Sequence, residues 1–101
     1  NFDGTGTPAV RASGNVSSIT DNGVGNYTVN FSTALSDANY CALASVTSLG
    51  SVNSSTNCVD VFASAGNTRV APTTSAFRLF VFHPGNQAAQ DAVYITATAY
   101  R

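Results

Sequence analysis

The sequence predicts an all-β fold: an antiparallel β-sandwich of about seven or eight short strands, in one domain that covers residues 1–101. Charged residues make up 9% of the chain, and lysine and glutamate, two strong helix formers, do not occur. Segments rich in Val, Thr, Tyr and Phe, which favour strands, alternate with turn clusters of Gly, Asn, Ser and Pro. No stretch has the period of a long amphipathic helix and no repeat is visible, so helical and repeat folds are excluded.

The clearest element is a hairpin within residues 11–40. Val16 and Ile19 belong to a β-branched run, and the residues Asp-Asn-Gly-Val-Gly-Asn at 21–26 end it with turn chemistry. Residues 27–31 then alternate large apolar with small polar side chains, the period of a half-buried strand. The expected strands, in order and each bounded by a turn cluster, are residues 9–13, 15–20, 26–32, 40–47, 58–64, 69–71, 76–82 and 92–100.

Two of these strands carry apolar side chains on both faces. One face of residues 76–82 begins with Phe77, and the opposite face presents Phe80; the last strand likewise opposes Ile95 to Tyr94. A small sandwich buries one face of each strand, so a second copy of the chain is expected to cover the other. A partly exposed aromatic strand, or a strand capped by residues 83–90, is the alternative. The side chains expected at an oligomer interface are Phe77, Leu79, Phe80, Val81, Phe82, Tyr94 and Tyr100.

The hairpin region also carries a longer pattern. Residues 1–40 contain N-F-x-G-T-G-T, then R-A-S-x-N-V-S-S-I-T-D-N-G-x-G-x-Y-T-V-N-F, and finally D-A-N-Y. This stretch resembles a module at the C-terminal tips of tailed-bacteriophage tail fibres, and residues 93–101 are similar in style. The resemblance implies a homotrimer at the distal end of a tail fibre in the virion. It also implies adhesion to a host-cell surface receptor, either a glycan or an outer-membrane protein. Since the chain contains no Met, we expect it to be the C-terminal module of a longer fibre protein.

The two cysteines leave their pairing open. A hairpin that turns at residues 49–50 would place Cys41 opposite Cys58, which invites a disulfide. In a protein assembled in a bacterial cytoplasm, two thiols are more often small buried apolar groups.

No constellation of side chains predicts catalysis, a metal site or a cofactor. His83 is the only histidine, with no evident nucleophile or orienting acid, and it is expected to be a turn residue. The cluster at 21–26 lacks the spacing and the terminal Glu of a calcium loop. Asp60 is the only mid-strand carboxylate, so the paired carboxylates of a glycosidase are not evident. We expect no enzyme activity.

Composition and loops together predict a binding module. The chain has a net charge of −1 and no basic patch, which disfavours nucleic acid, and no apolar run is long enough for membrane insertion. Amide and hydroxyl groups beside aromatic rings are how lectin-like sites bind sugars, and long loops often carry recognition. Loops that are merely solvated remain the alternative. The receptor-binding candidates are Ser51, Asn53, Ser54, Ser55, Thr56, Asn57, Thr73, Thr74, Ser75, Asn86 and Gln87.

Two other functions fit the same pattern. The chain could act mainly as a structural domain that trimerises or caps the fibre. It could also be a carbohydrate-binding module of a bacterial surface protein.

Overall fold

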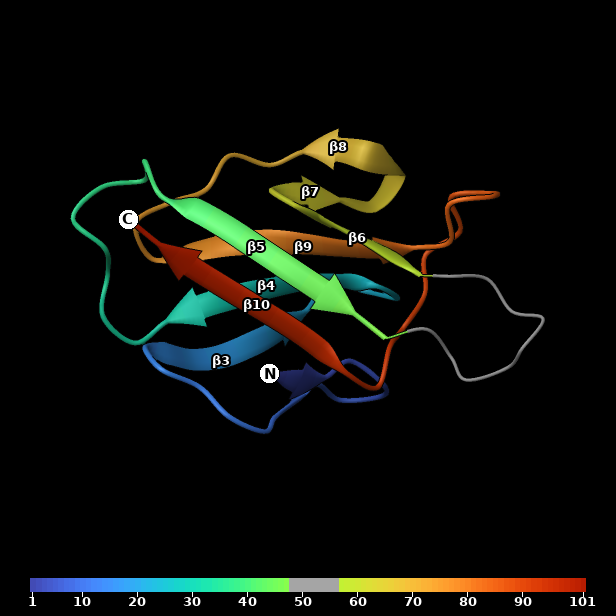
Figure 1. Cartoon of the computed structure of the whole chain (residues 1–101), viewed down its shortest axis with the longest axis horizontal. Coiled ribbons are helices and arrows are strands. Elements are labelled where there is room, and N and C mark those ends of the chain that lie inside the picture. The colour runs from blue at the N-terminus through green and yellow to red at the C-terminus, as the bar shows by residue number, and fades with distance from the viewer. Residues whose placement is uncertain (48–56) are drawn as a thin grey trace.

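The computed structural model describes residues 1–47 and 57–101 and forms an all-β fold of antiparallel sheets (Figure 1). The first sheet has the order β2 (Ala9–Val10), β1 (Phe2–Asp3), β10 (Ile95–Tyr100) and β5 (Cys41–Val46). The second sheet has the order β3 (Val16–Asp21), β4 (Asn26–Phe31), β9 (Ala76–Phe82) and β6 (Cys58–Val61). A small ladder of β7 (Ala63–Ser64) and β8 (Thr68–Arg69) lies beside them, joined by a 3₁₀ turn at Ala65–Asn67. The predicted all-β, antiparallel architecture is confirmed.

The predicted hairpin is the β3–β4 pair. Asp21 pairs with Tyr27, and a bulge between Val16 and Ser18 shifts the register at the far end. The Asp21 carboxylate accepts a hydrogen bond from the Gly23 N–H at 2.8 Å, and the Asn26 N–H donates to the Gly23 carbonyl at 2.9 Å. These bonds are those of a turn and leave the 21–26 cluster in the structural role that its sequence predicts.

Several strand boundaries differ from the prediction. The first sheet begins with β1 (Phe2–Asp3), which the sequence did not predict, and β10 begins at Ile95, three residues later than expected. The single strand expected at 58–64 is divided into β6 and β7. The cause is Phe62, whose φ of +60° turns the chain out of the second sheet and into the small ladder.

The core lies between the two four-stranded sheets. Phe77, Leu79 and Val81 point inward from β9 and pack with Tyr27 from β4 and Ile95 from β10. Beside them the rings of Phe31, Tyr40, Phe62 and Phe77 form an aromatic cluster of mostly edge-on pairs, with centroid separations of 5.8 to 6.3 Å.

The outer face of β9 is covered within one chain, which corrects the expected oligomer interface. Phe77 and Phe80 are 2% exposed, and Leu79 and Val81 are 0% exposed, so these four side chains have no surface to offer a second copy. Phe80 sits in register between Asn26 and Asp60 of the flanking strands and stacks on Phe82 at 5.6 Å.

The end of β9 is also lined by the chain that follows it. The N–H of Gln90 donates to the Val81 carbonyl, that of His83 donates to the Ala88 carbonyl, and Ala89 bridges to Phe82. Residues 88–90 therefore return along the strand and pair with its backbone. That residues 83–90 cover the outer face of the strand stays a prediction.

Tyr94 and Tyr100 remain at the surface, 51% and 52% exposed. The guanidinium of Arg11 lies over the Tyr94 ring at 4.3 Å and also pairs with Asp3 at 2.7 Å, so Tyr94 is partly covered by its own chain. A role for Tyr94 and Tyr100 in an oligomer interface stays a prediction.

The cysteines are free and do not face each other. Cys41 begins β5 and pairs with Tyr100 of β10, whereas Cys58 begins β6 and pairs with Phe82 of β9. The two strands belong to different sheets and start at opposite ends of the molecule (Figure 1). The prediction of a hairpin that places Cys41 opposite Cys58 is therefore wrong. In the described part of the chain no helix has the length and apolar character to cross a membrane.

Candidate binding surfaces

The predicted receptor-binding residues do not gather in one place. Ser51, Asn53, Ser54, Ser55 and Thr56 lie outside the described residues. Thr73, Thr74 and Ser75 precede β9, whereas Asn86 and Gln87 follow it, so the two groups lie at opposite ends of that strand (Figure 1).

Many polar groups of the loop at 73–75 form hydrogen bonds within the chain. The Thr73 hydroxyl oxygen accepts hydrogen bonds from the N–H groups of Ser75 and Ala76, at 3.3 and 3.1 Å. The Thr74 carbonyl accepts from the Leu35 N–H at 2.8 Å, and the Tyr40 hydroxyl donates to the Thr73 carbonyl at 3.0 Å. Thr73 is therefore mainly a turn residue, while the side chains of Thr74 and Ser75 are exposed.

The opposite end brings together four polar residues, which we call the amide end: Asn57, His83, Asn86 and Gln87. Cys58 pairs with Phe82, which places Asn57 beside His83 at the same end of the second sheet. Asn57 is 7% exposed, and its side-chain Nδ2 has no hydrogen-bond partner in the described ranges 1–47 and 57–101. Asn86 and Gln87 are exposed.

The turn at the amide end is ordered by its own hydrogen bonds. The His83 Nδ1 accepts from the Gly85 N–H at 2.9 Å, and the His83 carbonyl accepts from the Gln87 N–H at 2.7 Å. The Asn86 Oδ1 accepts from the Ala88 N–H at 3.1 Å. His83 thus acts as a turn residue, as predicted.

A buried network anchors this end of the molecule, and the sequence did not reveal it. The Tyr27 hydroxyl donates to the Gly4 carbonyl at 2.7 Å and to the Asp91 carboxylate at 2.6 Å. The same Asp91 oxygen accepts from the Gly25 N–H at 2.8 Å. Burial, followed by the hydrogen bond to Asp91, raises the pKa of Tyr27 well above its ordinary value. The network ties the hairpin turn, the N-terminal turn and the segment before β10 to one another.

Replacing Tyr27 with phenylalanine should lower the free energy of unfolding by about 2 kcal/mol, because the buried Gly4 carbonyl loses its hydroxyl donor and the half-buried Asp91 carboxylate loses one of its two donors. Urea denaturation measures this loss. Tyr94→Phe is the matched control: its ring is 51% exposed, and removal of its hydroxyl should change stability by less than about 0.5 kcal/mol. Equal effects of the two substitutions would contradict the network.

The same variant has a pH signature. Because the folded-state pKa of Tyr27 is raised, the stability it contributes is complete below the ordinary tyrosine pKa of about 10 and is lost as the pH rises above that value. The wild type should therefore lose stability more steeply than Tyr27→Phe in this range. Burial also raises the pKa of Tyr40, which is present in both proteins, so the difference between them isolates Tyr27.

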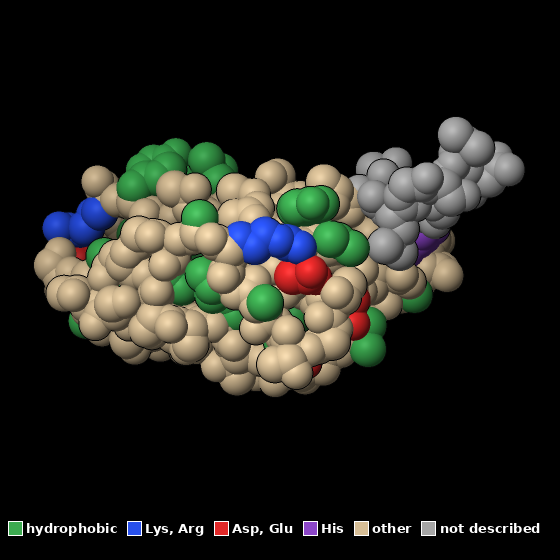
Figure 2. All heavy atoms as spheres, turned by 90° about the horizontal axis from the view of Figure 1, so that it is seen from below, with side chains coloured by type: hydrophobic (Ala, Val, Ile, Leu, Met, Phe, Trp, Pro, Cys, Tyr) green, Lys and Arg blue, Asp and Glu red, His purple; other side chains and the backbone are tan. Residues whose placement is uncertain are grey.

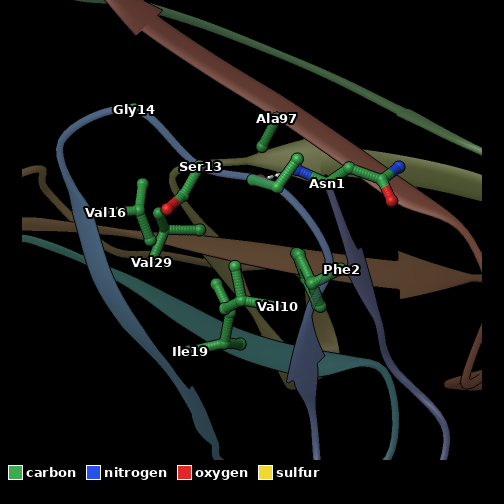
Figure 3. Close-up of a pocket in the computed structure, with 10 residues that line it drawn as sticks. Asn1, Phe2, Val10, Ser13, Gly14, Val16, Ile19, Val29 and Ala97 are labelled. Carbon is green, nitrogen blue, oxygen red and sulfur yellow. Dashed lines mark hydrogen bonds between the residues drawn. The ribbon is translucent and has the colours of Figure 1, made fainter.

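A groove opens between the sheets along the side of β10 that faces away from β5. It consists of two adjoining cavities of about 100 and 240 Å³, and Val16, Val29 and Ala97 line both. Figure 3 shows the smaller cavity, into which the side chains of Phe2, Val10, Val16, Ile19 and Val29 point. No charged side chain lines either cavity.

A second apolar surface lies on the outer face of the first sheet. Leu43 is 55% exposed on β5 and Tyr100 is 52% exposed on β10, and exposed Cys41 pairs with Tyr100. We call these three side chains the Tyr100 patch. Figure 2 shows hydrophobic side chains gathered over this face at the upper left, near the C-terminal end.

The carboxylates have local structural roles or are exposed. Asp3 pairs with Arg11, Asp37 forms a salt bridge with Arg101, and Asp91 belongs to the Tyr27 network. Hydrogen bonds from the Thr5 side chain and N–H hold the pKa of Asp3 below its usual value. Asp60, the mid-strand carboxylate, points to solvent. Across the described residues no group of three or more His, Cys, Asp or Glu side chains is placed to hold a metal ion. Comparison with family models, curated proteins and solved structures finds no match.

Proposed function

We propose that this chain is a β-sandwich receptor-binding module at the tip of a bacteriophage tail fibre, which attaches noncovalently to a glycan or protein of the host-cell surface. The observation that carries the proposal is the amide end, an exposed polar surface at the end of β9, which lies at the same end of the molecule as the Tyr27 network. The resemblance of residues 1–40 to fibre tips supports the same conclusion.

The chemistry of the amide end suits an uncharged, hydroxyl-rich ligand. Asn86 and Gln87 are exposed at this turn, amide side chains of this type both donate and accept hydrogen bonds, and residues 83–90 include no Asp, Glu, Lys or Arg. A glycan hydroxyl needs such two-way partners. Binding by one copy would be weak, and a homotrimer would raise the total affinity by avidity.

Altering the amide end should reduce adsorption to host cells at least tenfold. Each copy would lose one or two hydrogen bonds to the ligand, and in a trimer this loss is repeated at every site. Asn86→Asp keeps the oxygen that accepts from Ala88 but removes the amide donor, and Gln87→Gly tolerates the φ of +57° at that position. The double variant is compared with the wild type by cell adsorption and on a glycan array.

The loop at the other end of β9 provides the matched control. Thr74→Asp with Ser75→Gly introduces the same charge and likewise one glycine into an equally exposed turn. Adsorption should stay within about twofold of the wild type. Failure of the assembled wild-type protein to bind host cells or any glycan, or an equal loss in both variants, would refute adhesion through the amide end.

A structural role in the fibre is the second candidate, and the Tyr100 patch favours it. Leu43 and Tyr100 are exposed apolar side chains on the outer face of the first sheet, and such side chains are suited to contact between copies in a trimer. If this were the main function, substitution at Tyr100 would dissociate the assembly while changes at the amide end left adsorption intact.

A further inference from the structure

We infer that the cavity between β6 and the segment at residues 69–72 is a second binding site, which takes an acidic sugar: a pyranose ring that carries one carboxylate. The cavity shares no residue with the amide end, and the inference does not depend on adhesion there. It depends on three features of the cavity: walls that the fold holds in place, an apolar lining, and two charged side chains without partners.

The cavity lies where the chain leaves the second sheet and enters the small β7–β8 ladder (Figure 1). Its volume of about 520 Å³ is in the range typical of small-molecule sites. Apolar residues at 61–63 and 70–72 form most of the lining, and Asp60 and Arg69 are the two charged residues in it. An apolar cavity with a few polar groups is the usual form of a ligand site.

Both walls are held in place by backbone pairing. On one side, Asp60 of β6 pairs with Phe80 of β9. On the other side, Arg69 pairs with Ala63 in the small ladder. Phe62 joins the two walls, since its N–H donates to the Arg78 carbonyl at 2.8 Å and its carbonyl accepts from the Val70 N–H at 2.7 Å. A site with fixed walls loses little conformational entropy when it binds a ligand.

Phe62 opens the cavity through an unusual backbone conformation. Its φ of +60° is rare for a bulky side chain, and strained residues of this kind are concentrated at ligand sites. The turn separates β6 from β7, so the chain after Phe62 leaves the line of β6 and returns through β8 to the other wall of the cavity.

The two charged side chains of the cavity are the ones that the fold leaves unused. Every other Asp and Arg of the chain forms an ion pair or a hydrogen bond, as described for the salt bridges of Arg11 and Arg101 and for the bond from Arg78 to Asn26 at 2.9 Å. Asp60 and Arg69 are exposed and have neither kind of partner within residues 1–47 and 57–101. Their charges are therefore available to a ligand.

The chemistry of these two groups specifies the ligand. A guanidinium pairs with a carboxylate through two parallel N–H donors, so Arg69 is suited to bind the acid group of the sugar. A carboxylate only accepts hydrogen bonds, so Asp60 is suited to bind ring hydroxyls. The side chains of Val61, Val70 and Pro72 are apolar, as is the C–H face of a pyranose ring.

The separation of the two charges favours a sugar over an amino acid. Asp60 and Arg69 line one cavity but do not pair with each other, so a ligand that contacts both must carry its two polar groups apart. In an acidic sugar the carboxylate and the ring hydroxyls lie on different atoms of the ring. In an α-amino acid the ammonium and the carboxylate share one carbon atom.

The first test is an NMR titration of the protein with methyl glucuronide. The amide signals of Asp60, Arg69 and Val70 should shift, with a Kd of about millimolar for a ligand of this size. Methyl glucoside has the same ring but a hydroxymethyl group in place of the carboxylate, and it should bind at least tenfold more weakly. The methyl glycoside of N-acetylneuraminic acid tests the second kind of acidic sugar, and binding of either acid supports the inference.

Protein variants assign the two roles. Arg69→Gln should weaken glucuronide binding at least tenfold, whereas Arg101→Gln removes the same charge from an exposed arginine outside the cavity and should change it less than twofold. Asp60→Ala should weaken glucuronide binding several-fold but should not weaken binding of acetate, which has no hydroxyl groups. Asp60 and Arg69 are exposed, so these variants should fold.

Four results would overturn the inference. They are the absence of binding by both acidic sugars, equal binding of glucuronide and glucoside, an equal loss of affinity in Arg69→Gln and Arg101→Gln, and signal shifts confined to Asn86 and Gln87. The last result would place the sugar at the amide end. Tighter binding of glycine than of glucuronide would instead assign the cavity to an amino acid and would also contradict the inference.

Discussion

Replacing Gly25 with alanine is expected to destabilise the fold by about 3 kcal/mol or more, a large part of the 5–15 kcal/mol typical of a small domain. Gly25 has a φ of +66°, which disfavours a side chain, and an added Cβ would lie 2.3 Å from the Val81 carbonyl oxygen and 2.8 Å from that of Gln90. Both oxygens are backbone atoms, one near the end of β9 and one in the segment that returns along it, so the clash could be relieved only by moving these segments away from Gly25. Urea denaturation followed by circular dichroism measures the change.

Gly6→Ala separates backbone strain from the clash. Gly6 has a similar φ of +61°, but nothing lies within 4 Å of the Cβ that alanine would add. Its substitution should cost about 1 kcal/mol, the penalty of the left-handed conformation alone. If both variants lost the same stability, the close approach of Gly25 to Val81 and Gln90 would not be a determinant of the fold.

Gly25 also illustrates how far the sequence predicts this fold. The turn at residues 21–26 and the alternation of residues 27–31 are local signals, and the hairpin they predict is the β3–β4 pair. The contacts of Gly25 with Val81 and Gln90, and of Tyr27 with Asp91, join segments more than fifty residues apart. No local pattern encodes such pairings, which is why the anchoring network was missed.

The apolar strand 76–82 shows a second limit. Its residues were correctly placed on a strand, but the inference that the outer face needs another subunit treated the strand in isolation. In the sheet, β9 lies between β4 and β6, and the neighbours Asn26 and Asp60 flank Phe80 on both sides. A central strand can thus bury a ring on its outer face with no second layer.

The candidate site was predictable only in part. Loop composition singled out Asn86 and Gln87, which are exposed, but it did not show that Thr73, Thr74 and Ser75 lie at the other end of β9. The groove beside β10 was not predicted, because it lies between two sheets and its lining comes from segments far apart in the sequence. The alternating Ala97 and Ala99 were its only sequence signal, and small residues also fit close contact between copies.

Phe80→Ala is expected to cost about 3–5 kcal/mol of unfolding free energy, because it removes a ring that is 2% exposed and leaves a cavity. The loss should be the same at all protein concentrations, since the ring is enclosed by its own chain. For an interface residue, the stability difference between the variant and the wild type would instead shrink on dilution, as the wild-type assembly dissociates. Urea denaturation at several protein concentrations distinguishes these outcomes.

Tyr100→Ser is the counterpart on the proposed interface. Tyr100 is 52% exposed on the outer face of β10, so its removal should change the stability of the single fold by less than about 0.5 kcal/mol. In a trimer that buries the Tyr100 patch, the same change removes an aromatic anchor from each contact and should shift the mass measured by light scattering from trimer to monomer. Phe80→Ala should leave the mass of the folded protein unchanged. A trimer that persists in Tyr100→Ser but dissociates in Phe80→Ala would place the interface on the second sheet and contradict the enclosure of β9.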